Sequence, residues 1–261
     1  MRLNPLACSS VGRIAPSIIW ILLPDSGGEI LPVGAVGTPT FSPPCGARSH
    51  GEGLSTDVAA SYNWRVEPLI SGSLALIASY LLGSVSFAIL VSASQGVDIR
   101  SEGSGNPGTS NVLRVMGRRS AVLVLAGDGI KGAAAAWLGS VAVGPEFGFV
   151  TLLVAVVGHT FPIWHGFRGG KSVATAIGGF LFLAPGVGAL LTVVWIVMVA
   201  VWKTASIASI ATMALAVPAM WLAGRSTSEL AWTGVVAIFV LVRHSSNIKR
   251  LIGSSEEKVS G

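Results

Sequence analysis

Seven apolar stretches, nearly free of charge, restrict the fold of this 261-residue chain more than any other feature. They cover residues 69–93, 120–143, 147–161, 173–183, 186–202, 207–223 and 230–242. Charged residues make up only 11% of the chain, against about a quarter in soluble domains, and the mean hydropathy is +0.71. The stretches lack the strict alternation of barrel strands, so helices must satisfy their backbone in lipid. We predict an all-α polytopic membrane protein with about seven transmembrane helices, of which 173–183 and 230–242 are the weakest.

Basic residues are concentrated on alternate connections between these stretches. They are Arg100, Arg114, Arg118 and Arg119, then Arg168 and Lys171, then Lys203, and finally Arg243, Lys249 and Arg250. The intervening connections hold only Arg225. The positive-inside rule therefore predicts an N-terminus outside and a C-terminus in the cytoplasm, with all basic connections on the cytoplasmic face. The rule also explains the net charge of +5, and no basic tract with interleaved aromatics indicates a nucleic-acid partner.

Residues 1–66 differ in composition from the rest of the chain. They are rich in Pro and Gly, and their one apolar run, 14–23, is too short for a bilayer span of about 20 residues. We expect a disordered extension or a wrongly assigned start, the alternative being the apolar core of a signal peptide. The predicted organisation is an extension over 1–66, a membrane domain over 67–253 and a cytoplasmic tail over 254–261.

A first polar motif, GSGNPGTSNVLR, occupies residues 103–114. It matches the G-x-G-x-x-G pattern of dinucleotide-binding loops, but it follows an apolar span instead of a strand, so we do not favour that function. Glycine turns beside hydroxyl and amide donors and an arginine suit phosphate oxygens. The candidate phosphate-binding residues here are Ser104, Gly105, Asn106, Ser110, Asn111 and Arg114. The alternative is an interfacial turn whose arginine meets lipid headgroups.

A second polar motif, GHTFPIWHGFRGGK, occupies residues 158–171. Its end resembles a Walker A loop, but His165 stands where the first glycine would be, so it is not a P-loop. Lys171 after Gly169 and Gly170 can reach a phosphate as a point charge, or it can snorkel at a helix start. His159 is either a ligand of the same phosphate or a buried histidine that bridges helices, and the sequence leaves both open.

Two further polar pairs lie at predicted cytoplasmic span ends. Ser206 and Ser209 are three residues apart, and so are His244 and Asn247. Each pair could face a phosphate pocket, although serines in spans often bond backbone carbonyls and the residues around His244 could form a plain anchor. Because these sites meet on one face, we predict a membrane-embedded site for a phosphorylated substrate.

Asp128 and Lys131 lie inside an apolar stretch. At a spacing of three they share one helix face, so we expect them to pair. We interpret this pair as structural, with positioning of the first motif as the alternative. The two cysteines, Cys8 and Cys45, and the four histidines have no metal-ligand spacing, so we expect neither metal nor cofactor.

The order of these motifs resembles that of the bacterial acyl-phosphate:glycerol-3-phosphate acyltransferases, the PlsY family. The resemblance runs from about Tyr80 to Glu256 and includes Leu82-Gly83-Ser84, the first motif, Asp128 with Lys131, and the second motif. It continues through Val173-Ala174-Thr175, Ser206, Ser209, Arg243-His244, Asn247 and Arg250-Leu251. The chain departs from the family at Thr109-Ser110, where Ala-Thr is usual, at Ser172, where glycine is usual, and at Ser254-Ser255-Glu256, where Gly-Thr-Glu is usual.

The resemblance implies a multi-pass protein of the bacterial inner membrane with a cytoplasmic active site. The implied reaction moves a fatty acyl group from acyl phosphate to the 1-hydroxyl of glycerol 3-phosphate, giving lysophosphatidic acid without acyl-CoA or a metal. It implies catalytic roles for Arg114, Lys171, His244 and Asn247, with His244 as the best candidate to engage the attacking hydroxyl. The alternative function is a transporter of a phosphorylated solute, which should show inverted repeats and broken helices in matching halves, and the sequence shows neither.

Overall fold

The computed structural model describes residues 53–256 and 258–259, and these residues form helices and no strands. The helices are α1 (Gly53–Ser84), α2 (Phe87–Ala93), α3 (Thr109–Met116), α4 (Arg118–Ala142), α5 (Phe147–Thr160), the 3-10 helix η1 (Ile163–His165), α6 (Val173–Leu183), α7 (Pro185–Trp202), α8 (Ala205–Leu222), α9 (Thr227–Arg243) and α10 (Ser245–Ile252). The predicted all-α class is confirmed. Expectations for residues 1–52 fall outside the described residues, and α1 begins inside the predicted extension 1–66.

Among the described residues, five segments are long and apolar enough to cross a membrane: Leu69–Ala93, Arg118–Ala142, Phe147–His165, Pro185–Trp202 and Ala205–Leu222. The predicted stretches 173–183 and 230–242 are also helical, as α6 and α9. However, α6 has only 11 residues, about 16 Å of helix against a hydrocarbon core of about 30 Å.

The first span is interrupted, which the sequence did not predict. Helix α1 ends at Ser84, and α2 restarts at Phe87 with Ser86 as its N-cap, whose hydroxyl accepts from the backbone N–H of Ile89. In a continuous helix the Ile89 N–H would donate to the Val85 carbonyl. Because it donates to the Ser86 hydroxyl instead, the Val85 carbonyl is available to another donor.

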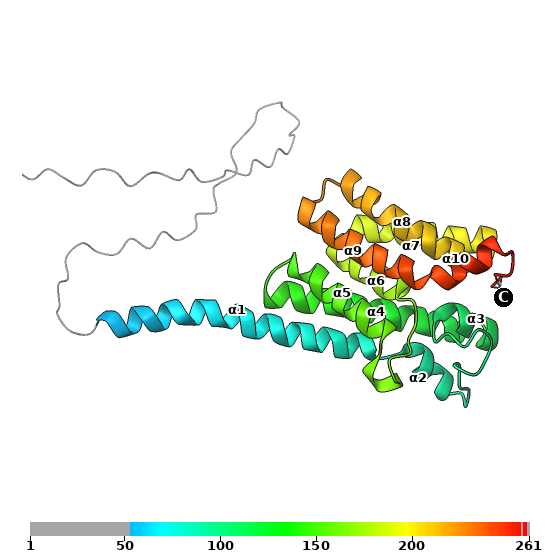
Figure 1. The fold of residues 1–261 in the computed structure, drawn as a ribbon, viewed down its shortest axis with the longest axis horizontal. Helices are drawn as coiled ribbons and strands as arrows, with labels where there is room; N and C mark the ends of the chain where they lie inside the picture. Colours follow the sequence, from blue (N-terminus) through cyan, green and yellow to red (C-terminus); the bar gives the residue numbers. More distant parts are fainter. Residues whose placement is uncertain (1–52, 257, 260–261) are drawn as a thin grey trace, which may run out of the picture. The chain divides into compact units, whose positions relative to one another are not determined.

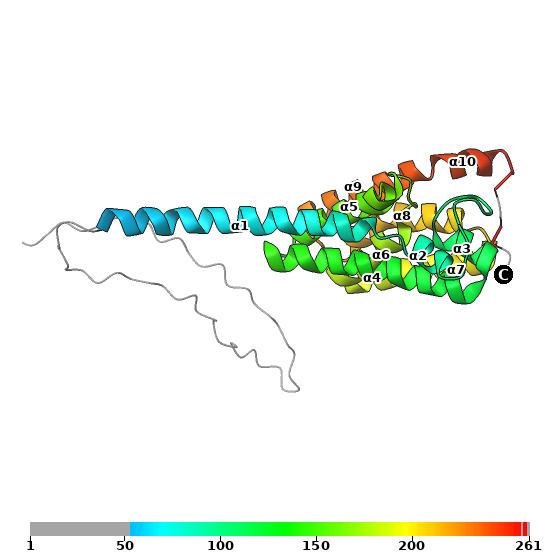
Figure 2. The same ribbon diagram turned by 90° about the horizontal axis from the view of Figure 1, so that it is seen from below.

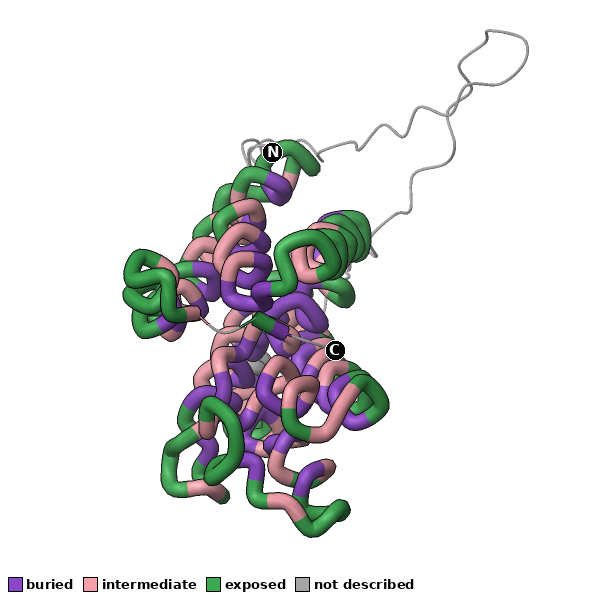
Figure 3. The backbone as a smooth tube through the Cα atoms, turned by 90° about the vertical axis from the view of Figure 1, so that its right-hand side faces the viewer, coloured by how far each residue is buried: buried purple, intermediate pink, exposed green. Residues whose placement is uncertain are grey.

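The helices of residues 69–252 run side by side, with α3 and α10 at the same end (Figures 1 and 2). Helix α4 packs against α2, α3, α5 and α6, while α7, α8 and α9 form a consecutive layer. One core cluster joins α4, α5 and α6 to α7, α8 and α9, and a smaller one lies beneath α2 and α3. Buried residues lie on the inward faces (Figure 3).

Glycines set the distance between α4 and α6. A Cβ on Gly132 would lie 2.0 Å from the Thr175 carbonyl oxygen, and one on Gly178 would lie 2.0 Å from the Gly129 oxygen. The two backbones therefore touch, as small residues allow in membrane helix pairs. This contact holds α6, whose first turn follows Lys171, against the helix that carries Asp128 and Lys131.

We predict that Gly132→Ala lowers the thermal unfolding midpoint of the detergent-purified protein, because the added methyl group must push α6 from α4. The expected loss is about 2 kcal/mol or more, as in other overpacked contacts. Gly234→Ala on α9 is the control, since its Cβ would meet only Val217 at an ordinary 3.8 Å. Equal midpoints for the two variants would contradict the close contact.

Candidate functional site

A cavity of about 1250 Å³ lies at the end of the bundle where α3, α6, α8 and α10 begin. Nearly all predicted site residues line it: Ser104, Gly105, Asn106, Ser110, Asn111, Arg114, His159, Gly169, Lys171, Ser206, Ser209, His244 and Asn247. Gly170 does not. The structure therefore brings together both motifs and both polar pairs, which are up to about 140 positions apart in the chain.

The four helix N-termini at the cavity lack side-chain caps. The N-cap residues Gly108, Ser172, Thr204 and His244 make no capping bond to the first turns of α3, α6, α8 and α10. Of the helices that begin at the opposite end, α9 has a complete capping box at Ser226 and Glu229, whereas α5 and α7 also lack side-chain caps. Uncapped N-termini carry free N–H groups and the positive end of the helix dipole, so their convergence favours an anion.

Asn111 organises the first loop. Its side-chain NH₂ donates to the carbonyls of Ile99 and Glu102, and its oxygen accepts from the backbone N–H of Ser104. The amide is buried and engaged with the loop that it closes. The Ser104 hydroxyl accepts from Arg114, which joins the predicted phosphate cation to the same loop. Phosphate contact by Asn111 stays a prediction, since its observed contacts are all with the loop backbone.

The second loop is tied to the end of α5. The backbone N–H groups of Gly169 and Gly170 donate to the carbonyls of Thr160 and His159. A Cβ on Gly169 would lie 2.0 Å from the His159 carbonyl oxygen, so this approach requires glycine. The loop delivers Lys171 to the cavity.

Ser172 follows in the left-handed region, at φ 64°. This conformation explains why glycine suits the position in the resembling family. Here the Ser172 hydroxyl donates to the Val156 carbonyl and shares a 2.8 Å hydrogen bond with the Thr160 hydroxyl. These buried hydrogen bonds to α5 offset the backbone strain. They explain how this chain accommodates serine where the family usually has glycine.

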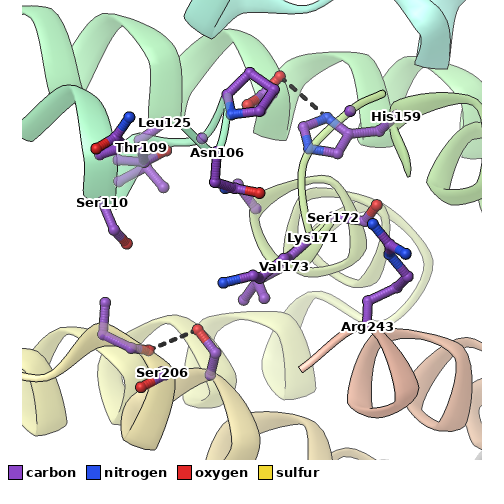
Figure 4. Close-up of a pocket in the computed structure, with 18 of the residues that line it drawn as sticks. Asn106, Thr109, Ser110, Leu125, His159, Lys171, Ser172, Val173, Ser206 and Arg243 are labelled. Atoms are coloured by element: carbon purple, nitrogen blue, oxygen red, sulfur yellow. Dashed lines mark hydrogen bonds and ion pairs between the residues drawn. The ribbon is translucent and has the colours of Figure 1, made fainter. Parts of the chain in front are cut away.

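Lys171 points into the space between α3 and α8, with Ser110 and Ser206 on either side (Figure 4). Burial, together with the positive charge of Arg250, lowers the pKa of Lys171 to about 8. Arg114 and Arg243 also line the cavity and act in the same direction. A site whose cations lower the pKa of a neighbouring lysine gains from a bound anion.

His244 and Asn247 face the cavity as acceptors. Nδ1 of His244 lies 2.8 Å from the Val240 carbonyl, which can only accept, so Nδ1 carries the proton and Nε2 keeps its lone pair. Burial lowers the pKa of His244 to about 4, so the ring is neutral near pH 7. Asn247 donates to Glu256, while its Oδ1 is buried without a hydrogen-bond partner among the described residues.

Ser209 is already engaged at its place on the cavity wall. Its hydroxyl donates to the Ala205 carbonyl and accepts from the indole N–H of Trp195. The alternative reading of this serine, a bond to its own helix backbone, is therefore present in the structure. Its predicted phosphate contact remains a prediction.

An apolar arm extends from the polar end of the cavity between α4, α6 and α7. It is lined by Leu125, Ala126, Ile130 and Ala133 of α4, Ile177 and Leu181 of α6, and Trp195 and Ile196 of α7. Ile130 is 67% exposed and Ile196 52%, so the arm opens sideways on the apolar surface of the bundle. A ligand that fills both parts must be amphiphilic, with an anionic head and a hydrocarbon tail.

Sequence reasoning missed several cavity residues. Glu256 lines the cavity and binds Asn247 and Arg250 through its two carboxylate oxygens. Arg243 also lines it, and its guanidinium lies 5.3 Å from the Phe161 ring centroid. Both belong to motifs already noticed, Arg243-His244 and the terminal Ser-Ser-Glu. Among the described residues, no cluster of three or more His, Cys, Asp or Glu side chains could hold a metal.

The described residues define a helical integral membrane protein with a cavity that combines cationic side chains with an apolar lining. The family model for glycerol-3-phosphate acyltransferase matches residues 73–254, and the chain belongs to this family. The glycerol-3-phosphate acyltransferase of Shewanella halifaxensis is 44% identical over 188 residues, covering 71% of this chain and 93% of that protein. One from Neisseria meningitidis serogroup C is 41% identical over 195 residues, covering 72% and 96%.

Two solved structures are similar to this one. They are crystal structures of PlsY (YgiH), an integral membrane glycerol 3-phosphate acyltransferase, in a glycerol 3-phosphate form and a lysophosphatidic acid form. Both are 34% identical and cover 72% of this chain and 95% of that chain, with TM-scores of 0.68 and 0.67. The resemblance inferred from the motifs is confirmed.

We predict that the affinity for inorganic phosphate falls as the pH rises from 7.5 to 9.5. Lys171, with a pKa of about 8, loses its charge in this range, whereas phosphate remains anionic. In Lys171→Arg the guanidinium stays charged, so affinity should change little over the same range. Calorimetric titration of the detergent-purified proteins would measure this, and parallel pH profiles would exclude Lys171 from the phosphate site.

We also predict that glycine at residue 172 leaves the stability of the protein nearly unchanged, whereas valine lowers it. Ser172→Gly relieves the left-handed backbone while losing two hydrogen bonds, so stability should stay within about 1 kcal/mol. Ser172→Val keeps the strain and leaves the buried Thr160 hydroxyl without this partner, so it should cost about 2 kcal/mol or more. Thermal unfolding of both variants would test this, and a stable valine variant would contradict it.

Proposed function

We propose that this protein transfers a fatty acyl group from acyl phosphate to the 1-hydroxyl of glycerol 3-phosphate, releasing lysophosphatidic acid and phosphate. The observation that carries the proposal is the cavity itself. It joins uncapped helix N-termini and buried cations to an apolar arm that opens sideways. The relatives and neighbours named as glycerol-3-phosphate acyltransferases support the acceptor and product.

In the proposed reaction the 1-hydroxyl oxygen attacks the acyl carbonyl carbon, and the bond from that carbon to the phosphate oxygen breaks. Charge develops on the departing phosphate, where Arg114, Lys171 and the helix N-termini stabilise it. Such a leaving group needs little help from a general acid. The donor's hydrocarbon chain lies in the apolar arm, which is the reason for proposing a fatty acyl phosphate as the donor.

His244 receives the attacking hydroxyl. Its Nε2 lone pair accepts the hydroxyl hydrogen, and the unpaired Oδ1 of Asn247 is a second acceptor for the glycerol moiety. With a pKa of about 4, His244 is a weaker base than a phosphate group, whose second pKa is about 6. We therefore assign His244 to orientation of the hydroxyl and the leaving phosphate to final receipt of its proton.

The remaining predicted phosphate contacts belong to the same proposal. Ser104, Gly105, Asn106 and Ser110 act from the first loop, Gly169 and Gly170 shape the second, and Ser206 and Ser209 complete the wall. The backbone of Gly170 positions Lys171 without facing the cavity itself.

We further propose seven spans, with the N-terminus outside, the C-terminus inside and the site on the cytoplasmic face of the bacterial inner membrane. The connections that carry the basic residues meet at the cavity, whereas Arg225 lies at the other end and donates to the Leu183 carbonyl. Helix α9 has an exposed apolar face at Val235, Ile238 and Val242, which suits a lipid-facing span. Helix α6 counts as a half-span that begins in the cavity.

A transporter of a phosphorylated solute remains the alternative from another class. The break at residues 85–86 and the short α6 resemble the interrupted helices of transporters. The acyltransferase names of the relatives do not favour it, and a solute carrier has no need of an apolar arm beside its anion site.

The test measures phosphate release from palmitoyl phosphate by the detergent-purified protein, with and without glycerol 3-phosphate. We expect release that depends on glycerol 3-phosphate and yields lysophosphatidic acid. Lys171→Ala should lower kcat/KM by about 100-fold, the usual loss of a stabilising group at a developing anion. Lys249→Ala is the matched control, because this α10 lysine is exposed outside the cavity lining.

Palmitoyl-CoA is the control donor. Turnover with palmitoyl-CoA but not with palmitoyl phosphate would refute the proposed donor while keeping the acyltransferase. No turnover with either donor in a well-folded sample, together with uptake of glycerol 3-phosphate into proteoliposomes, would establish the transporter. Activity that survives Lys171→Ala would keep the reaction and discard the proposed phosphate site.

A further inference from the structure

A buried charged cluster lies at the inner wall of the cavity, where the two polar loops meet. Asp128 and Lys131 of α4 and His159 of α5 are each at most 6% exposed. Lys131 Nζ lies 2.7 Å from Asp128 Oδ1, which confirms the predicted pairing, and His159 Nδ1 lies 3.5 Å from the same oxygen. Asp128 and His159 line the cavity, whereas Lys131 does not.

The ammonium group of Lys131 has a full set of acceptors. It lies 2.6 Å from the Val85 carbonyl, 2.7 Å from the Asp128 carboxylate and 2.7 Å from Nδ1 of His159. An ammonium carries three hydrogens and no lone pair. The break between α1 and α2 supplies the first acceptor, because Ile89 bonds to the Ser86 hydroxyl and leaves Val85 free.

The closer of two contacts at Nδ1 indicates the tautomer of His159. Nδ1 lies 2.7 Å from the Lys131 ammonium and 3.5 Å from the Asp128 oxygen. An ammonium can only donate, so this closer contact favours a lone pair on Nδ1 and a proton on Nε2. Nε2 lies beside Gly170, where a Cβ would come within 2.3 Å of it and within 3.0 Å of the Pro107 carbonyl. Glycine therefore leaves room for the Nε2 edge at the junction of the two loops.

We propose that Asp128 and Lys131 are positioning residues that hold His159 as an Nε2–H donor, and that this N–H donates to a phosphate oxygen in the cavity. The assignment deepens the proposed function and rests on it for the identity of the anion. Under this assignment His159 is both a buried histidine and a ligand of the phosphate. His244 has the opposite tautomer, with a lone pair on Nε2, so the cavity holds one histidine donor and one histidine acceptor.

A buried ion pair usually adds little to stability, since well-packed apolar residues in its place often give an equally stable protein. Stability alone therefore does not explain why this pair is present. The pair is better explained by what it does to the imidazole. Without it, His159 could place its proton on either nitrogen, and one tautomer would turn a lone pair toward the phosphate oxygens.

The first test is the tautomer in the unmodified protein. In long-range ¹⁵N–¹H spectra of the detergent-purified, ¹⁵N-histidine-labelled protein, the His159 signals are assigned by their loss in His159→Gln. We expect a protonated Nε2 and an unprotonated Nδ1, with the Nε2 proton signal shifting when inorganic phosphate is added. A protonated Nδ1, or no shift at saturating phosphate, would overturn the proposal.

The second test compares His159→Gln with His159→Asn. The glutamine amide nitrogen reaches the position of Nε2, whereas the asparagine nitrogen reaches only that of Nδ1. Phosphate should therefore bind about tenfold more tightly to the glutamine variant, the usual effect of one hydrogen bond to a charged group. Equal affinities, or tighter binding by the asparagine variant, would overturn the role of the Nε2 donor.

The third test removes the pair without leaving an unpaired charge. Asp128→Asn combined with Lys131→Met should give mixed His159 tautomers and about tenfold weaker phosphate binding at a nearly unchanged unfolding midpoint. If phosphate binding weakened while His159 kept its wild-type tautomer, the pair would have only a structural role and the proposal for it would be wrong. If this variant does not fold, the spectra and the glutamine–asparagine comparison decide the question. A protein with the expected tautomer and phosphate shift but no acyl transfer would keep this inference and refute the proposed function.

Discussion

The backbone contact between α4 and α6 is the constraint on which the cavity depends. Gly132 faces the carbonyl of Thr175, and Gly178 faces that of Gly129, at distances that no side chain would allow. Helix α4 carries Asp128 and Lys131, and the first turn of α6 follows Lys171. If the two helices separated by the width of a methyl group, the loop that carries Lys171 would move away from His159 and Asp128. The close packing of α4 against α6 therefore fixes the geometry of the site.

The electrostatics of the cavity follow from placing cations and helix N-termini where water is scarce. Burial and neighbouring positive charges lower the pKa of Lys171 to about 8, so the cavity disfavours the charge of its own lysine. The negative charge of Glu256 offsets part of this effect by raising the pKa of Lys171. A phosphate would supply the remaining negative charge, and it would meet donors whose orientation exists before binding. The bond network of Asn111 and the anchoring of Ser172 serve that preorganisation.

Much of the fold could be read from hydropathy, because lipid leaves an apolar segment few alternatives to a helix. Six of the seven predicted stretches coincide closely with single helices. The exception is 69–93, where the break at residues 85–86 depends on Ser86 capping α2 and on a lysine 46 positions away that donates a hydrogen bond to the freed carbonyl. Local propensity cannot reveal a partner that distant. Likewise, Asn111 and Ser209 line the cavity, but their hydrogen bonds to nearby backbone and to Trp195 were not foreseeable from spacing.

By itself, the sequence determined the helical class, the family and the residue types available for the site, since composition, ordered motifs and charge position are properties of the chain alone. The tertiary structure alone decided how those groups are used. It left Gly170 outside the cavity lining, brought Glu256 and Arg243 into it, and placed Lys131 beside Nδ1 of His159 and the Val240 carbonyl beside Nδ1 of His244. The reason is physical: a proton on an imidazole goes where the surrounding donors and acceptors put it, and packing alone assembles that surrounding.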